Sequence, residues 1–442
     1  MTEHRARKSL VRQRMAQTGE SYSTALRHVT TQRHGTDQPH NTDQPHGTDQ
    51  PHNTDQPHGT DQPHNTDQPH NTDQPHNTDL PHNTDQRAAA PIPGLVAGYP
   101  AFGAQYHRPS ALSRHLLAQA GLDISEPIAC GLGGGIGFLY AIFEYVGLPA
   151  PLLTIVAQHH PQPWFEAVTT HLGAATTTLT SSSPRTALAK LDAALDAGRP
   201  ALIVTGRGLL PWYGELSEWE AADAHPIVVA GRVDDDYLID DRSRQPQHID
   251  RDTLGAAWAA HRKSRFALTT VTALPDPVDL PAAIRAALIT TTDHLTGPVL
   301  GHYFDANMGL RGMAKFVAEL RDSRTKTGWA RRFPTDEALS AALRRLAECL
   351  TTQYTAVGGT RPLYARFLTE AADVTDLDLL PAAEYARLSG QIWTQLADLA
   401  ERASRSGEIE DPAALRGQIA DLAETAVDTE TVLVQHIRSA MR

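Results

Sequence analysis

A six-residue repeat between His34 and Gln86 removes part of this chain from any globular core. Each unit follows His-(Asn/Gly)-Thr-Asp-Gln-Pro, and Leu80 is its only large apolar residue. Such a segment cannot bury enough apolar surface to offset its ordering entropy, so we expect disorder with extended, polyproline-like stretches. Its histidines recur every six residues, which is not the spacing of a preformed metal site. Weak multivalent metal binding is one alternative, but a repeat without chemistry is favoured, and we predict no metal and no cofactor.

Composition and charge exclude several classes of protein. The 442 residues contain no run of about 18 apolar residues and no secretory h-region, so no membrane span or signal peptide is expected. Two cysteines, Cys130 and Cys349, cannot form a disulfide framework, which favours a reduced, cytoplasmic setting. A net charge of −12 argues against general nucleic-acid binding. Residues 1–33 carry seven Arg or Lys and two Glu, and form either a basic docking element or, as favoured, a solvated, partly helical tail.

Hydrophobic periodicity divides the rest of the chain into two parts. Residues 88–272 mix strand and helix patterns, residues 273–281 contain three prolines and form a linker, and residues 282–442 are helical throughout. The expected strands are 152–157, 176–180, 201–205, 226–230, 237–240 and 266–272. The expected helices are 110–120, 184–197, 252–261, 282–293, 310–321, 335–350, 362–372, 381–403 and 412–441. The sequence therefore predicts an α+β chain with an α/β domain followed by an all-α domain.

A glycine-rich segment, Gly131–Gly137, resembles a phosphate-binding loop only superficially. A Walker loop continues with Gly-Lys-Ser/Thr, whereas here Phe138 and Leu139 follow. The spacing also differs from the Gly-x-Gly-x-x-Gly of a dinucleotide site, and no strand precedes it. We interpret the segment as a tight structural turn where helices approach closely.

A histidine at the start of an apolar strand is the strongest candidate for chemistry. His225 begins the strand 226–230, and a polar turn leads into 237–240, which ends at Asp240-Asp241. In an antiparallel hairpin the start of the first strand lies near the end of the second, so His225 should lie close to Asp240 or Asp241, and we select Asp240. An imidazole oriented by a carboxylate is part of a nucleophilic triad, although it is also common as simple structure.

Two long stretches then show a family resemblance. The residues that carry it are His107, Ser110–Leu112, Gly121-Leu122, Ser125–Pro127, Gly131–Phe138, His225 and Asp240 in the first stretch, and Asn307–Met313, Gly358–Ala372 and Trp393 in the second. The first stretch resembles the N-terminal domain of the butirosin biosynthesis protein H family, and the second resembles the domain of unknown function usually attached to it. The resemblance implies a papain-like α/β domain. It also implies an acyltransferase that moves an aminoacyl group from a carrier-protein thioester to an amine, with a cysteine after the histidine as nucleophile.

The chain departs from that family at the nucleophile, because Arg108 follows His107. An arginine stays protonated and cannot attack a thioester. Ser110 can take the role with His225 as base, or the pocket works without covalent catalysis. In that last case His225 is a general base or the pocket only binds, and Arg108 holds a carboxylate or phosphate or pairs with a nearby acid. Cys130 can also replace the thiol, but a buried structural cysteine is the favoured interpretation of it.

Two functions from different classes follow. The first is a biosynthetic acyltransferase-like protein with His225, Asp240 and Ser110 as catalytic residues and His107, Arg108, Trp212 and Tyr213 as substrate-binding residues. Its expected partners are an acyl carrier protein or a small-molecule amine acceptor, and neither a membrane nor a nucleic acid. The second is a catalytically inactive binding or scaffold protein in a natural-product pathway. Trp212 and Tyr213 either wall a groove or pack, and Arg361 and Tyr364 either line a cleft or bridge the two domains.

Overall fold

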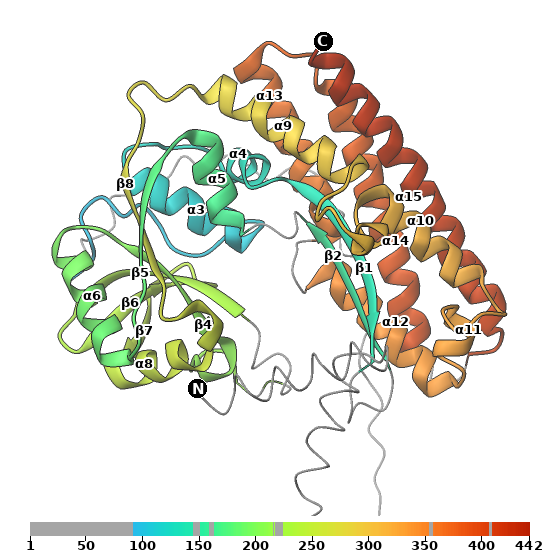
Figure 1. Cartoon of the computed structure of the whole chain (residues 1–442), viewed down its shortest axis with the longest axis horizontal. Coiled ribbons are helices and arrows are strands. Elements are labelled where there is room, and N and C mark those ends of the chain that lie inside the picture. The colour runs from blue at the N-terminus through green and yellow to red at the C-terminus, as the bar shows by residue number, and fades with distance from the viewer. Residues whose placement is uncertain are drawn as a thin grey trace, which may run out of the picture. The chain divides into compact units, whose positions relative to one another are not determined.

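The computed structural model describes residues 92–144, 151–158, 163–214, 216, 224–352, 357–405 and 409–442 (Figure 1). These residues all belong to one compact unit, Asp85–Arg442. The basic segment 1–33 and the repeat lie outside the described residues, so the predictions for them are left as predictions. None of the described helices is long and apolar enough to cross a membrane.

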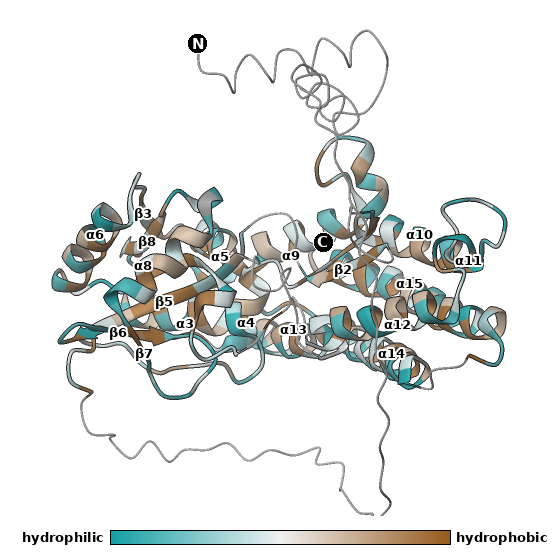
Figure 2. Ribbon diagram, turned by 90° about the horizontal axis from the view of Figure 1, so that it is seen from below, coloured by the Kyte–Doolittle hydropathy of each residue, from teal (hydrophilic) through white to brown (hydrophobic). Residues whose placement is uncertain are grey.

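A six-stranded antiparallel sheet forms the core of the α/β half. Its strands follow the spatial order β3 (Ala175–Leu179), β8 (Leu268–Ala273), β4 (Ala201–Gly206), β5 (Ala224–Val233), β6 (Asp236–Asp240) and β7 (Gln247–Asp250). The central strand β5 is largely brown in Figure 2 because it is apolar on both faces. Ile227 and Val229 pack with helices α6 (Pro184–Asp196) and α8 (Arg251–Ala260). Val228 and Ala230 pack on the other side with α3 (Arg108–Gln119) and α5 (Trp164–Leu172).

A second, two-stranded sheet packs against the helical half instead of joining the first sheet (Figure 1). It pairs β1 (Ile136–Phe143) with β2 (Leu152–Gln158) in antiparallel register. The alternation of side chains along β1 explains its position: Phe138 and Tyr140 enter the helical core with β2, whereas Leu139 and Ala141 face a separate small cluster. The strands β1 and β2 therefore pack with the helices even though they precede the six-stranded sheet in sequence.

Long helices make up the C-terminal half. They are α9 (Leu280–Thr296), α10 (Gly309–Arg321), α11 (Trp329–Arg332), α12 (Asp336–Thr351), α13 (Arg361–Thr375), α14 (Leu380–Arg405) and α15 (Pro412–Ala440), with short 3-10 helices η3 (Tyr303–Asn307) and η4 (Val357–Thr360). Side-chain caps at Asp279, Thr335 and Asp411 begin three of them. The α+β class is confirmed, and the predicted helices and strands agree with the structure within a few residues at each end. The sequence did not predict the helices α4 (Glu126–Leu132), α5 and α11, or the strands β1 and β7.

The glycine-rich segment is a site of close packing, as predicted. It runs from the last turn of α4 into β1, and a Cβ added to Gly131 would overlap the ring of Phe367 on α13. A Cβ on Gly135, whose φ is +64°, would overlap the ring of Tyr364 on the same helix. Only glycine lets the aromatic face of α13 pack this closely on the segment.

One buried arginine joins the hairpin to the helices. Arg361 is fully buried, and its guanidinium donates to the carbonyl oxygens of Gly137 on β1 and Ala157 on β2. The same group forms a bidentate ion pair with Glu430 on α15, at 2.8 and 2.9 Å. Of the two alternatives for Arg361, bridging is the one that the structure adopts.

Candidate functional site

The N-terminus of α3 brings residue 108 to the start of β5. Leu112 and Leu116 of α3 pack in one cluster with Val228 and Ala230 of β5, which fixes the helix across the sheet. The helix begins at Arg108, with His107 at its N-cap and a proline in its first turn. This is the position at which the resemblance places a nucleophile, beside the histidine strand.

His225 is held by a carboxylate at the end of β6. Its Nε2 lies 3.0 and 3.1 Å from the two carboxylate oxygens of Asp241, and the ring is 6% exposed. The hydroxyl of Tyr213 lies 3.1 Å from the same nitrogen, with its ring edge-on to the imidazole. With Nε2–H donating to Asp241, Nδ1 is the ring nitrogen left to act as a base.

The choice of Asp240 as the partner of His225 is wrong, and strand geometry gives the reason. Val228 pairs with Asp240, so the next pair places Asp241 opposite Ile227. Side chains alternate between sheet faces, so His225, Ile227 and Asp241 share one face and Asp240 lies on the other. The hairpin was predicted correctly, but the parity of its register decides which carboxylate meets the histidine.

Asp240 instead organises a second buried network. Its carboxylate accepts hydrogen bonds from the Tyr99 hydroxyl at 2.6 Å and the Gly103 amide at 2.7 Å, and lies 2.7 Å from Nδ1 of His115 on α3. Asp240 is fully buried. The segment before α3, the helix itself and the sheet are therefore joined through this one side chain.

Arg108 points into the site at His225. Its NH1 lies 3.3 Å from Oδ1 of Asp241 and donates to the carbonyl oxygen of Pro226, next to the histidine. The side chain of Arg108 is 24% exposed, whereas that of Asp241 is fully buried. The guanidinium thus occupies the place of the expected nucleophile and shares the carboxylate that orients His225.

The net effect of burial and the neighbouring charges is to lower the pKa of both His225 and Asp241. Burial is the largest effect on His225 and lowers its pKa; the Arg108 charge lowers it further, while the hydrogen bond to Asp241 opposes the shift. Burial also opposes ionisation of Asp241, but the His225 hydrogen bond and the Arg108 charge outweigh it and lower the pKa of Asp241 to about 2. At neutral pH the site therefore holds an ionised aspartate between a neutral imidazole and an arginine.

The structure does not bring Ser110 to His225. Two residues along a helix turn the side chain by about 200°, so Ser110 faces away from Arg108. Its Oγ is buried and lies 2.8 Å from Nδ1 of His107, whose Nε2 lies 2.9 Å from the Gln158 side chain. Burial raises the pKa of the Cys130 thiol, and the side chain of Ser110 partly opposes that shift. His107, Ser110 and Cys130 thus form a buried cluster on the far side of the helix.

The two aromatic residues before β5 enclose the histidine pair. Trp212 donates from Nε1 to Asp241 at 2.8 Å, and Tyr213 contacts His225 as described above. Both rings pack against the core cluster of the six-stranded sheet. The two rings pack around the site, and a role in walling a substrate groove stays a prediction.

Sequence reasoning missed several residues that shape this region. Tyr99, His115 and Gln158 lie in elements whose contacts with the site depend on tertiary structure, and no local pattern marks them. The available signal was the alternation of side chains along the hairpin, which places His225 and Asp241 on the same face of the sheet. Within the described part of the chain, no group of three or more His, Cys, Asp or Glu side chains is arranged to hold a metal ion.

Comparison with known proteins agrees with the domain order. Residues 107–242 match the family model described as butirosin biosynthesis protein H, N-terminal, and residues 255–437 match a domain of unknown function, DUF4872. No curated protein matches the chain. A solved structure described as a C39-like peptidase from Bacillus anthracis is similar to part of this chain, with 16% sequence identity and a TM-score of 0.29. The match covers 41% of this chain and 98% of that one, and no assignment rests on it. The chain therefore carries a domain of the butirosin biosynthesis protein H N-terminal family at residues 107–242, followed by DUF4872 at residues 255–437.

Proposed function

We propose that this protein acts in natural-product biosynthesis as an acyl-transfer family member that forms no acyl-enzyme. The observation that carries the proposal is the Arg108 guanidinium, which lies beside Asp241 and the Pro226 carbonyl where the family has its thiol. A permanently charged guanidinium cannot attack a thioester. Ser110 and Cys130 are buried away from His225, so neither replaces it. The remaining role is noncovalent: the α/β half binds a carrier-linked acyl group or its amine acceptor.

A second candidate is direct acyl transfer, with His225 as general base. The lowered pKa of His225 favours it, because the imidazole is neutral near pH 7 and can accept a proton. In that reaction an acceptor amine attacks the thioester carbonyl, a C–N bond forms, the C–S bond breaks, and Nδ1 of His225 takes the amine proton while the thiolate leaves. Both candidates exclude a covalent intermediate and differ only in whether His225 does chemistry.

Intact-mass measurements with an acyl-pantetheine thioester test the common claim. We expect no added mass on the wild-type chain, one acyl group on Arg108→Cys, and none on Arg108→Cys combined with His225→Ala. Arg114→Cys is the matched control, since it places a thiol on an accessible part of the same helix without His225 beside it. An acyl adduct on the wild type, mapped to any hydroxyl or thiol, would overturn the proposal.

Thiol release then separates the two candidates. The thioester is mixed with a panel of amines, and free thiol is measured with a chromogenic disulfide. Direct transfer predicts amine-dependent release that His225→Gln abolishes. The binding role predicts no release from either chain and saturable binding of the thioester to both.

A further inference from the structure

A second surface feature lies on the helical half, outside the His225 site. It is an open hollow of about 780 Å³ at the junction of η3 and α10. The residues that line it are Pro298, Gly301, His302, Tyr303, Asp305, Ala306, Arg311 and Lys315. Arg311 belongs to the stretch Asn307–Met313 that carries the resemblance of this domain, and the proposed function gives that stretch no role.

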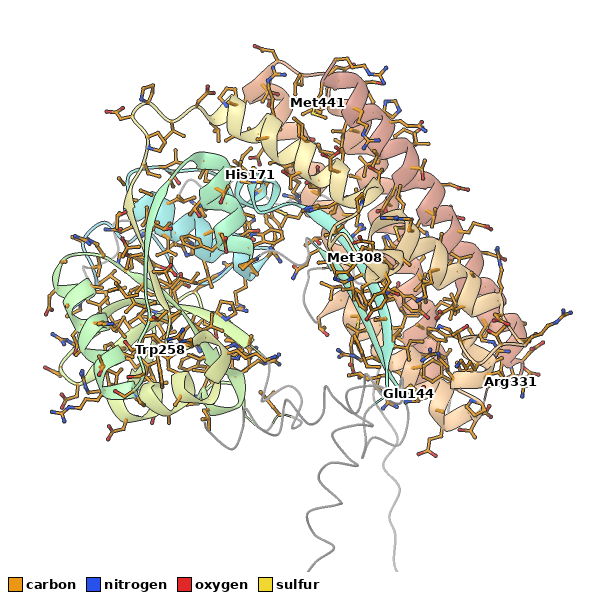
Figure 3. All side chains as sticks on the ribbon, viewed as in Figure 1. Glu144, His171, Trp258, Met308, Arg331 and Met441 are labelled. Carbon is orange, nitrogen blue, oxygen red and sulfur yellow. The ribbon has the colours of Figure 1, made fainter. Side chains whose placement is uncertain are left out.

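The loop beside the hollow is rigidly built. The carboxylate of Asp305 accepts backbone N–H groups from Val299 at 2.9 Å, Leu300 at 2.7 Å and His302 at 3.1 Å. Met308, labelled in Figure 3, forms a β-bridge with Leu139 of β1 and anchors the other end of the loop. A loop held in this way keeps its backbone in place without a ligand, which lowers the entropy lost on binding.

This rigid loop presents an aromatic ring to solvent. Tyr303 is 90% exposed, far more than any other large apolar side chain among the described residues. Its neighbour Phe304 packs instead against the cluster of Leu139 and Met308. The loop therefore buries one ring and holds the adjacent one outside, beside the hollow, where it can stack on a flat group.

Two cations face the same hollow from one side of α10. Arg311 and Lys315 are four residues apart, a spacing at which like charges repel. Arg311 uses one nitrogen on the Gly297 carbonyl at 2.7 Å, and its side chain is exposed. Lys315 donates to the Asn307 side chain at 2.7 Å and lies 3.7 Å from Glu319.

The carboxylates at or near the hollow are engaged in hydrogen bonds within the protein. Both oxygens of Asp305 accept backbone amides of the loop. Glu319 is 9% exposed and accepts the hydroxyl of the buried Tyr140 at 2.7 Å. Asp305 lines the hollow but its oxygens are already bonded to the loop, and Arg311 and Lys315 are the cationic side chains of the lining.

We propose that this hollow binds a ligand of the nucleotide class, with phosphate oxygens on Arg311 and Lys315 and a flat ring stacked on Tyr303. Guanidinium and ammonium groups suit phosphate, and a tyrosine face suits a base. The site lies in the helical half and does not depend on the function proposed for His225. It gives the domain of unknown function a binding role of its own.

Calorimetric titration of the full chain with ADP, pyrophosphate and adenosine tests the proposal. We expect saturable ADP binding, weaker binding of pyrophosphate and still weaker binding of adenosine. Replacing both cations, Arg311→Gln with Lys315→Gln, should weaken ADP binding by about tenfold or more, because the charge-assisted hydrogen bonds to the phosphates are lost. Tyr303→Ala should weaken ADP but leave pyrophosphate unchanged.

Arg344→Gln is the matched control, because Arg344 is an exposed arginine on the neighbouring helix α12 and lines no part of the hollow. Circular dichroism melts confirm that each variant folds. ADP binding by the double variant equal to wild type would overturn the proposal, as would the absence of saturable ADP binding at low salt.

Discussion

The buried pair of Arg361 and Glu430 should be the most sensitive electrostatic contact of the helical half. The Arg361 guanidinium makes five hydrogen bonds, two to Glu430 and three to the carbonyl oxygens of Gly137, Ala157 and Gly359. Both side chains of the pair are 0% exposed. Arg361→Met retains comparable bulk but leaves the Glu430 charge without its partner and three carbonyls without a donor.

The expected loss follows from that geometry. Removing one member of a buried ion pair costs roughly 3–5 kcal/mol because the other charge stays buried. Ser389 and Trp393 still donate to Glu430, at 2.7 and 2.9 Å, which keeps the loss from rising further. Glu430→Gln should also destabilise the protein, and the double variant should lose about 2 kcal/mol less than the sum of the two single losses.

Urea unfolding followed by tryptophan fluorescence measures these free energies, with Arg321→Met as the control. Arg321 also has bidentate acidic contacts, to Asp421 and Glu424, but on the surface, where such pairs contribute little. A loss for Arg361→Met no larger than that of Arg321→Met, or additive losses in the double variant, would refute the reasoning.

Three further perturbations have defined outcomes. Gly131→Ala should destabilise the chain by about 1–3 kcal/mol, because the new methyl group overlaps an aromatic ring of α13. Gly417→Ala is the control and should not destabilise it, because Gly417 has open space around it. Equal unfolding midpoints for the two variants would contradict this prediction. The pKa of Asp241 is about 2, below its unfolded value of 3.8, so its stabilisation of roughly 2 kcal/mol is present above pH 4 and lost as pH falls through 2. Asp241→Asn should flatten that part of the acid-unfolding profile, and an unchanged profile counts against the ion pair. Cys130 and Cys349 are fully buried with raised pKa values, so iodoacetamide should label neither in the native protein and both in denaturant; rapid native labelling would contradict the packing.

Local patterns predict most of the helices and strands, because an amphipathic face is visible in the sequence whatever it packs against. The hairpin of β1 and β2 shows the limit of that information. Its strands are apolar on both faces, so periodicity cannot say whether they join the large sheet or the helices. Only the position of Arg361, more than 200 residues away along the chain, and the helical core fix the answer.

Only part of the candidate site, likewise, could be predicted from local sequence patterns. The hairpin that brings an aspartate to His225 follows from turn and strand patterns, but the choice between Asp240 and Asp241 follows from the parity of the register. The contact of Arg108 with that aspartate depends on how α3 crosses the sheet, which is a tertiary property. Arg361 was similarly ambiguous, since a charged residue becomes fully buried only where distant groups satisfy it.

The packing of β1 and β2 against the helical half also has a consequence for folding during synthesis. During synthesis these strands, residues 136–158, leave the ribosome well before α10, α12 and α15, which cover them in the finished core. A two-stranded hairpin alone is at best marginally stable in water. Its apolar faces therefore stay uncovered until more than 150 further residues have been synthesised. A nascent chain stopped at the end of the six-stranded sheet would therefore expose an unpartnered ribbon, and this segment is where we expect a chaperone to bind the growing protein.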